Sequence, residues 1–290
     1  MGHSSEVTRR SFMRYGAAVF GTVAATGLGP STARAAGRRI PIGLQLYSVR
    51  DECGKDFPGT VAKVAEMGYQ GVEFAGYYGR SAEEVRKLLD DNGLKCCGTH
   101  AGLTTLLGDE FERTVEFNKA IGNKYLVVPG IPGNMRPDSK SGWVLFAKLM
   151  NELAIRAAEH DMQVGYHNHA WEFEPMNDDI PWEVFANNSD EDVILQVDIG
   201  HVVRAGADPA NHMKRHPGRL VTVHVKEFSK TERDPLVGEG DVDWPTMFEV
   251  CEDVGGTEWY IVEDESQNNP LRRVRTDLQN LKRMLREYHA

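Results

Sequence analysis

Cysteine is scarce in this 290-residue chain, which has only Cys53, Cys96, Cys97 and Cys251. No two of them have the CxxC spacing of a zinc or redox pair, and the adjacent Cys96 and Cys97 would point to opposite faces of a strand. The spacing therefore gives no sign of a cysteine-based metal site and requires no disulfide. We expect all of these thiols to be buried or half-buried.

The chain is also poor in positive charge, with 33 lysine and arginine residues against 43 aspartate and glutamate residues, a net charge of −10. A protein of this charge is poorly suited to a phosphate backbone, so we expect no nucleic-acid partner. Short repeats and low-complexity tracts are also missing from the sequence. The hydrophobic fraction of 41% is ordinary for a globular enzyme.

Long apolar runs are missing too, and the small-residue stretch 17–28 is too short and too rich in glycine to span a bilayer. It follows Arg9-Arg10 and precedes Ala33-Arg34-Ala35, an A-x-A cleavage pattern. This combination resembles a twin-arginine export signal; the alternative is an anchor helix behind a chance arginine pair. We predict a signal peptide over 1–36, a mature domain over 37–290 with no stable membrane insertion, and export to the periplasm or another extracytoplasmic compartment.

Apolar runs alternate with helical patterns from residue 40 onwards. The runs that predict strands cover 40–46, 69–74, 94–99, 124–130, 162–166, 192–197, 219–225 and 258–262. The helical patterns cover 58–67, 82–92, 109–121, 143–160, 181–187, 210–216, 245–254 and 270–288. Repeated strand-helix units over about 250 residues, with strands apolar throughout, predict an α/β fold, a single-domain (β/α)8 TIM barrel. A doubly wound open sheet usually needs a glycine-rich turn after its first strand, and 46–50 has no glycine.

Side chains that can bind a metal stand at the carboxyl ends of the last predicted strands, in chain order His167, Asp198, His224 and Glu263. In such a barrel these strand ends meet at one face, so we expect the side chains to converge. Imidazoles and carboxylates together suit one divalent cation, Mn first and then Co, Zn or Mg. The alternative is that some of them are helix caps or ion-pair residues.

The motifs around these residues carry a family resemblance. They are 165–173 (Gly-Tyr-His-Asn-His-x-x-Glu-Phe), 198–201 (Asp-x-Gly-His), 224–227 (His-Val-Lys-Glu) and 260–264 (Tyr-Ile-Val-Glu-Asp). Together they resemble the xylose-isomerase-like barrel superfamily over residues 40–288, and more narrowly its exported sugar phosphate isomerase/epimerase proteins. The resemblance implies one divalent metal at the positions just named. It also implies a homo-oligomer, since barrels of this superfamily often pair.

His167 departs from the ketose 3-epimerases of this superfamily, which have a glutamate at that position as one of a pair of catalytic carboxylates. Its loss argues against a symmetric two-glutamate mechanism. The histidine-rich motif is instead similar to inosose dehydratases and to barrel subunits that cleave 3-keto-glycosides by β-elimination. Glu172 either replaces the missing carboxylate or is a loop acid that points to solvent.

The reactions of these relatives transfer a proton next to a carbonyl, so the site needs a base and an acid. Glu263 is the first candidate for the base. Lys226 alternates with His224 along the strand and should reach the same cavity, unless it pairs with Glu227 or a barrel acid. The candidates for the acid or for hydroxyl contacts are His169, His201 and Lys226.

A polar rim and aromatic rings would complete a sugar pocket. The substrate contacts predicted from strand ends and loops are Tyr47, Glu73, His100 and Glu172. The rings predicted to stack on a sugar are Trp143, Trp171 and Trp244.

These observations favour a divalent-metal-dependent isomerase or epimerase that acts on a keto-sugar through an enediolate. One alternative is a lyase that performs β-elimination on a 3-keto-glycoside or an inosose-like substrate, and another is a sugar-binding barrel without turnover. The negative charge and the export signal disfavour a nuclease on the same barrel. The sequence leaves open a functional coupling to a sugar oxidoreductase that would supply the ketone.

Overall fold

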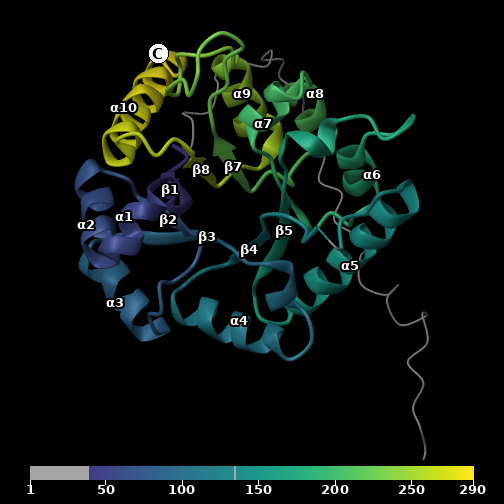
Figure 1. Ribbon diagram of the computed structural model, residues 1–290, viewed down its shortest axis with the longest axis horizontal. Coiled ribbons are helices and arrows are strands. Elements are labelled where there is room, and N and C mark those ends of the chain that lie inside the picture. The colour runs from purple at the N-terminus through teal and green to yellow at the C-terminus, as the bar shows by residue number, and fades with distance from the viewer. Residues whose placement is uncertain (1–38, 134) are drawn as a thin grey trace, which may run out of the picture. The chain divides into compact units, whose positions relative to one another are not determined.

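The computed structural model describes residues 39–133 and 135–290. Within them an 8-stranded parallel sheet has the order β6-β5-β4-β3-β2-β1-β8-β7, which follows the chain round a barrel (Figure 1). The strands are β1 Ile42–Gln45, β2 Gly71–Phe74, β3 Lys95–His100, β4 Tyr125–Val128, β5 Gln163–His167, β6 Ile194–Gln196, β7 Thr222–Val225 and β8 Trp259–Val262. The predicted TIM barrel is confirmed. The predicted signal peptide over 1–36 lies outside the described residues.

The barrel closes between β6 and β7 through a seam that differs from the other strand pairs. All other neighbouring strands form parallel ladders. Across the seam, in the part of the chain that the structure describes, Asp198 and His224 form an isolated parallel bridge. Two backbone hydrogen bonds of 2.9 Å accompany it, from Leu195 N to Arg219 O and from His224 N to Val197 O. The seam therefore places two predicted metal ligands side by side.

Helices surround the strands in Figure 1. They are α1 Arg50–Lys55, α2 Phe57–Met67, α3 Ala82–Asp91, α4 Glu110–Ala120, α5 Lys140–Ala158, α6 Pro181–Asn188, α7 Ile199–Arg204, α8 Pro209–Lys214, α9 Trp244–Val250 and α10 Pro270–Tyr288. The sequence missed α1 and α7, which are too short to show an apolar stripe. None of the described helices has the length and apolar character needed to cross a membrane.

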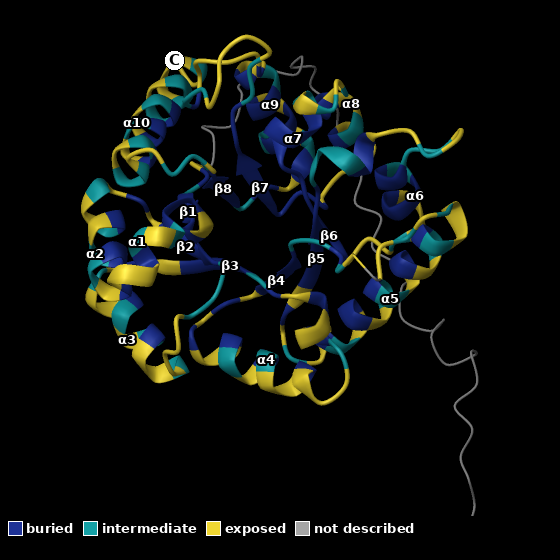
Figure 2. Ribbon diagram, in the orientation of Figure 1, coloured by how far each residue is buried: buried dark blue, intermediate teal, exposed yellow. Residues whose placement is uncertain are grey.

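The strands are buried on both faces, as expected for a parallel sheet covered by helices (Figure 2). All the cysteines are buried and unpaired, as predicted. Polar exceptions stand out inside the barrel, because Gln45, Glu73 and Gln196 are each 0% exposed. Buried polar groups need partners, and these residues find theirs at the candidate site.

Candidate functional site

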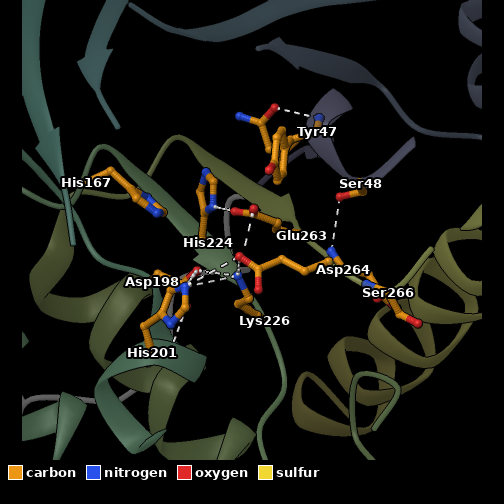
Figure 3. A network of polar contacts seen from close by, with 12 residues as sticks. Tyr47, Ser48, His167, Asp198, His201, His224, Lys226, Glu263, Asp264 and Ser266 are labelled. Atoms are coloured by element: carbon orange, nitrogen blue, oxygen red, sulfur yellow. Dashed lines mark hydrogen bonds and ion pairs between the residues drawn. The ribbon is translucent and has the colours of Figure 1, made fainter. Parts of the chain in front are cut away.

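Ligand-type side chains from β5 to β8 meet at the carboxyl ends of the strands, as the sequence predicted. Each offers one ligand atom, and these atoms lie within 4.8 Å of one another; the residues are His167, Asp198, His224 and Glu263, all buried. Figure 3 shows that they reach the same space from separate elements. This mixed nitrogen and oxygen set can hold a divalent cation.

Asp198 has an oxygen without a hydrogen-bond partner among the described residues. Its Oδ1 accepts from His201 N at 2.8 Å, whereas the buried Oδ2 accepts no hydrogen bond and lies 3.5 Å from Lys226 Nζ. Asn168 fixes the backbone of Asp198, because Asn168 Oδ1 accepts from Asp198 N at 2.9 Å. An unsatisfied buried carboxylate oxygen is costly, so a bound cation fits this position.

His224 lies between two carboxylates. Its Nδ1 is 2.6 Å from Glu263 Oε2, and its Nε2 is 2.6 Å from Glu73 Oε2. Burial disfavours a charged imidazole, but the attraction of both carboxylates outweighs it and raises the pKa of His224 to about 10. Each ring nitrogen therefore carries a proton. A ligand nitrogen must be deprotonated, so a metal held by His224 would displace one of these protons.

His167 is neutral. Burial, and then the neighbouring imidazoles His224 and His100, lower the pKa of His167 well below its usual value. Its Nδ1 lies 3.1 Å from Gln196 Oε1, which can only accept, so the Nδ1 proton points there. The Nε2 lone pair is then available to a ligand, which is the form in which imidazole binds metals.

Glu73 is not a rim residue, and the prediction that it contacts substrate was wrong. It is fully buried, with Oε1 accepting from Gln196 Nε2 at 2.8 Å and Oε2 accepting from Gln45 Nε2 at 2.7 Å. A Cβ on Gly98 of β3 would lie 2.5 Å from Glu73 Oε1, so glycine there makes room for the carboxylate. Because protein groups occupy both oxygens, Glu73 supports His224 from behind.

Lys226 lies among the acids at the mouth of the barrel. Its Nζ is 2.8 Å from Glu265 Oε1 and 3.8 Å from Glu263 Oε1, and it lies 3.2 Å from His201 Nε2. Burial opposes the charge, but these acids and Asp198 hold the pKa of Lys226 above its usual value, so the ammonium stays charged. Lys226 reaches the cavity as predicted. No role was predicted for Glu265, although its place two residues after Glu263 was a signal.

A pocket of about 310 Å³ opens at the ligands. It is lined by Tyr47, Ala75, His100, Pro129, His167, His169, Glu263 and Glu265. Burial, and then the nearby His201, lower the pKa of His169 to about 4, so its imidazole is neutral near pH 7. Its Nδ1 has no hydrogen-bond partner within the described ranges. That Nδ1 is buried and lies 4.0 Å from Glu172 Oε1, so it faces the protein, and the rest of the neutral ring lines the pocket.

A second pocket, of about 410 Å³, shares Glu263 and Glu265 with the first. Its walls also include Lys226, Arg204 and Phe228. The two pockets are therefore adjacent, and Lys226 lines the second of them, 2.8 Å from the shared residue Glu265.

Glu172 neither joins the ligand cluster nor points to solvent, so both predicted roles were wrong. It is fully buried, its Oε1 lies 2.7 Å from Tyr166 OH, and its Oε2 accepts from His169 N at 2.8 Å. Burial raises the pKa of Glu172 to about 8. The residue fixes the turn η3 (Ala170–Phe173) that follows His169 and does not contact a substrate.

Two of the tryptophans predicted to stack on a sugar belong to the core instead. Trp143 is fully buried in α5, and Trp244 begins α9, where its Nε1 donates to Glu227 Oε2 at 2.7 Å. Trp171 is half-buried in η3, with the Arg136 guanidinium 4.1 Å from its ring centroid. A contact between Trp171 and substrate stays a prediction.

The chain is similar to known proteins over most of its length. The model of the family described as xylose isomerase-like TIM barrel matches residues 61–284. An inosose dehydratase from Clostridium perfringens (strain 13 / Type A) is 27% identical over 262 residues, covering 76% of this chain and 88% of that protein.

Solved structures share the fold. A sugar phosphate isomerase/epimerase from Parabacteroides distasonis aligns with a TM-score of 0.72 and 24% identity, covering 84% of this chain and 98% of that one. An L-ribulose 3-epimerase aligns with a TM-score of 0.65 and 12% identity, covering 86% and 95%. At these identities the likeness is one of architecture.

Proposed function

Because the chain belongs to the xylose isomerase-like TIM barrel family, we propose that it is a metal-dependent lyase that acts by β-elimination on a keto-sugar or a ketone-bearing cyclic polyol. The observation that carries this proposal is a pair of unlike groups, neutral His169 in one pocket and cationic Lys226 in the adjacent one. An elimination needs one group to accept a proton and another to assist the leaving group. The similarity to an inosose dehydratase supports the same reaction class.

The metal would be held by the cluster of His167, Asp198, His224 and Glu263. The free Asp198 Oδ2 and the neutral His167 fit a divalent cation, and the mixed donor set favours Mn, with Co, Zn or Mg as alternatives. When bound, such a cation polarises the substrate carbonyl and makes the neighbouring C–H more acidic.

His169 is the base in this proposal, in place of Glu263. Glu263 already shares Oε2 with His224; although burial tends to raise its pKa, Lys226 and His224 hold the pKa of Glu263 well below its usual value. Glu263 is therefore held by two cationic side chains and belongs to the ligand cluster, which leaves the proton transfer to a group outside that cluster. The imidazole of His169, which lines the first pocket and lies outside the ligand cluster, instead accepts the proton from the carbon next to the carbonyl.

Lys226 assists the leaving group. As the proton moves to His169, the electron pair of the broken C–H bond forms a C=C bond and the C–O bond to the leaving group breaks. The Lys226 ammonium donates a proton to the departing oxygen, and Glu265, 2.8 Å away, holds the ammonium in place. His201 Nε2, 3.2 Å from Lys226 Nζ, accepts from the ammonium and helps to orient it.

The second pocket favours a leaving group larger than hydroxide. It begins at Glu263 and Glu265 and extends past Phe228, so a substrate that spans both pockets would place the bond between its two parts beside Lys226. A 3-keto-glycoside has this two-part shape, whereas an inosose would fill the first pocket alone.

An isomerase or epimerase is the second candidate. His169 and Glu263 line the same pocket, so a proton taken by one could be returned to carbon by the other. The lyase and the isomerase or epimerase predict different products, because only the lyase releases a leaving group.

The test incubates the purified chain with Mn²⁺ and, in separate reactions, an inosose, a 3-keto-glucoside and free ketoses, and identifies the products by mass. A product lighter by the leaving group supports the lyase. An epimer with solvent deuterium at one carbon supports the second candidate. Metal and sugar binding without turnover of any ketone contradicts both and leaves a sugar-binding barrel.

A further inference from the structure

The side-chain amide of Gln196, in β6, contacts four polar groups in the interior of the barrel. Its Nε2 lies 2.8 Å from Glu73 Oε1 and 2.9 Å from Thr222 Oγ1. Its Oε1 lies 2.8 Å from His100 Nε2 and 3.1 Å from His167 Nδ1. Gln196 is 0% exposed, so water cannot replace any of these partners.

The orientation of this amide follows from its neighbours. Gln45 Oε1 accepts from Tyr47 N at 2.9 Å, so Gln45 must turn its Nε2 toward Glu73, whose carboxylate acts as an acceptor. A carboxylate accepts and does not donate, so Gln196 also turns Nε2 to Glu73. The carbonyl Oε1 of Gln196 is left for the imidazoles, and each of them must donate to it.

Two overlapping sets of metal-ligand side chains exist at this position. One is the mixed set already described, and the other is His100, His167 and His224, whose nitrogens also lie within 4.8 Å of one another. His100 Nε2 is occupied by the hydrogen bond to Gln196 and also lies 3.2 Å from Glu73 Oε2, whereas the bond to His167 uses Nδ1 and leaves Nε2 free.

We propose that Gln196 is a positioning residue that determines metal specificity, by aiming His167 at the metal and holding His100 away from it. Imidazole-rich sites favour zinc, nickel and copper, while carboxylates shift the preference toward manganese and magnesium. Gln196 thereby keeps the site a mixed one. The inference rests on the metal site of the proposed function and not on the reaction that the site performs.

The first measurement is the tautomer of the imidazoles in the metal-free full chain, by nitrogen-15 NMR of labelled histidines, assigned with the variants His167→Gln and His100→Gln. The expected result is a proton on Nδ1 of His167 and on Nε2 of His100. A proton on Nε2 of a neutral His167 in the wild type overturns the proposal, whatever the variants do.

The second measurement is the ratio of Mn²⁺ to Zn²⁺ affinity by competition. Gln196→Met removes the acceptor; it should weaken Mn²⁺ binding by about 10- to 100-fold, the usual effect of removing a group that orients a ligand, and should weaken Zn²⁺ binding less, so that the ratio shifts toward zinc. Gln196→Glu keeps an acceptor for both imidazoles and should shift the ratio less. Gln45→Met is the matched control, since Gln45 is equally buried and also bonds Glu73, but among the described residues it forms no hydrogen bond with His100 or His167.

An unchanged ratio in Gln196→Met, an equal shift in Gln45→Met, or a wild type that binds neither metal overturns the proposal. These readouts need no substrate. If the protein fails every lyase assay but Gln196→Met shifts the ratio of metal affinities, the proposed reaction is refuted and the role of Gln196 is upheld. If the protein is an active lyase but the ratio does not shift, the reaction is upheld and the role of Gln196 is refuted.

Discussion

Glu73 at the end of β2 and Glu263 after β8 are buried carboxylates that hold the same imidazole, each 2.6 Å from a different nitrogen of His224. Their other contacts differ. Glu73 bonds Gln45 and Gln196, whereas Glu263 has one oxygen 3.8 Å from Lys226 and lines both pockets. Residue type and burial are alike on the two sides of the ring. What separates a supporting carboxylate from a ligand is whether protein groups occupy all of its oxygens.

The largest effect is expected from Asp198, on the Glu263 side of the ring. Asp198→Ala should abolish metal binding, and with it activity, because it removes the free carboxylate oxygen; metal analysis of the purified variant checks this. Asp208→Ala is the matched control, since Asp208 likewise caps a short helix, α8. Both variants should lose about 1 kcal/mol of capping stability. Retention of a full equivalent of metal by Asp198→Ala would contradict the assignment.

Lys226 is expected to matter for turnover and not for metal content. Lys226→Met should lower kcat by about 10²- to 10⁴-fold, the usual contribution of a general acid, while one equivalent of metal stays bound. Lys282→Met, at a half-buried lysine far along the chain that bonds Gly68 O, serves as the control. Steady-state kinetics with metal analysis of the same samples separates the two effects. Equal losses of metal and activity would reassign Lys226 to the metal site.

A direct comparison of the two carboxylates should give a smaller effect for Glu73. Glu73→Gln leaves all the ligands in place and should weaken metal binding by about 10- to 100-fold. Glu263→Gln removes a ligand and should weaken it further. Titration of each apo variant with Mn²⁺ measures both. Equal weakening of Mn²⁺ binding in the two variants would contradict the assignment of Glu73 as a supporting residue and Glu263 as a ligand.

Glu172 is a third buried carboxylate, and it differs from Glu73 and Glu263 because its pKa is raised, to about 8, whereas theirs are lowered. The unfolded chain ionises this group near pH 4.3, so the unfolded state binds fewer protons between about pH 5 and 8 and the free energy of unfolding falls as pH rises through that window. The slope is at most about 1.4 kcal/mol per pH unit. Glu172→Gln mimics the protonated form and should lack this loss. Urea unfolding at pH 5.5 and 8 checks it, and parallel pH dependence in both proteins would contradict it.

The barrel and the ligand cluster could be predicted because both follow from local patterns: apolar runs at a regular spacing, the last of which end in a histidine or an acid. The support from Gln45, Glu73 and Gln196 could not. Each is a lone polar residue at the end of an apolar run, and its partner lies 28 or 123 positions away. A sequence pattern shows that such a residue is unusual but not which group it bonds. The sugar contacts predicted for Trp143 and Trp244 were wrong for a different reason: near a predicted loop, the sequence does not show whether a tryptophan ring packs into the core or faces a pocket.

The seam between β6 and β7 has a further consequence, for the order in which the barrel opens. With a single bridge in place of a ladder, its few backbone hydrogen bonds are the ones that local opening breaks most easily. Asp198 and His224 stand on either side of it, so a shared cation would fasten the two edges and slow amide exchange at Leu195 and His224 by the free energy of its binding. Metal binding would then complete the closure of the barrel, and the rate of hydrogen exchange at those two amides would report how much of the protein carries the metal.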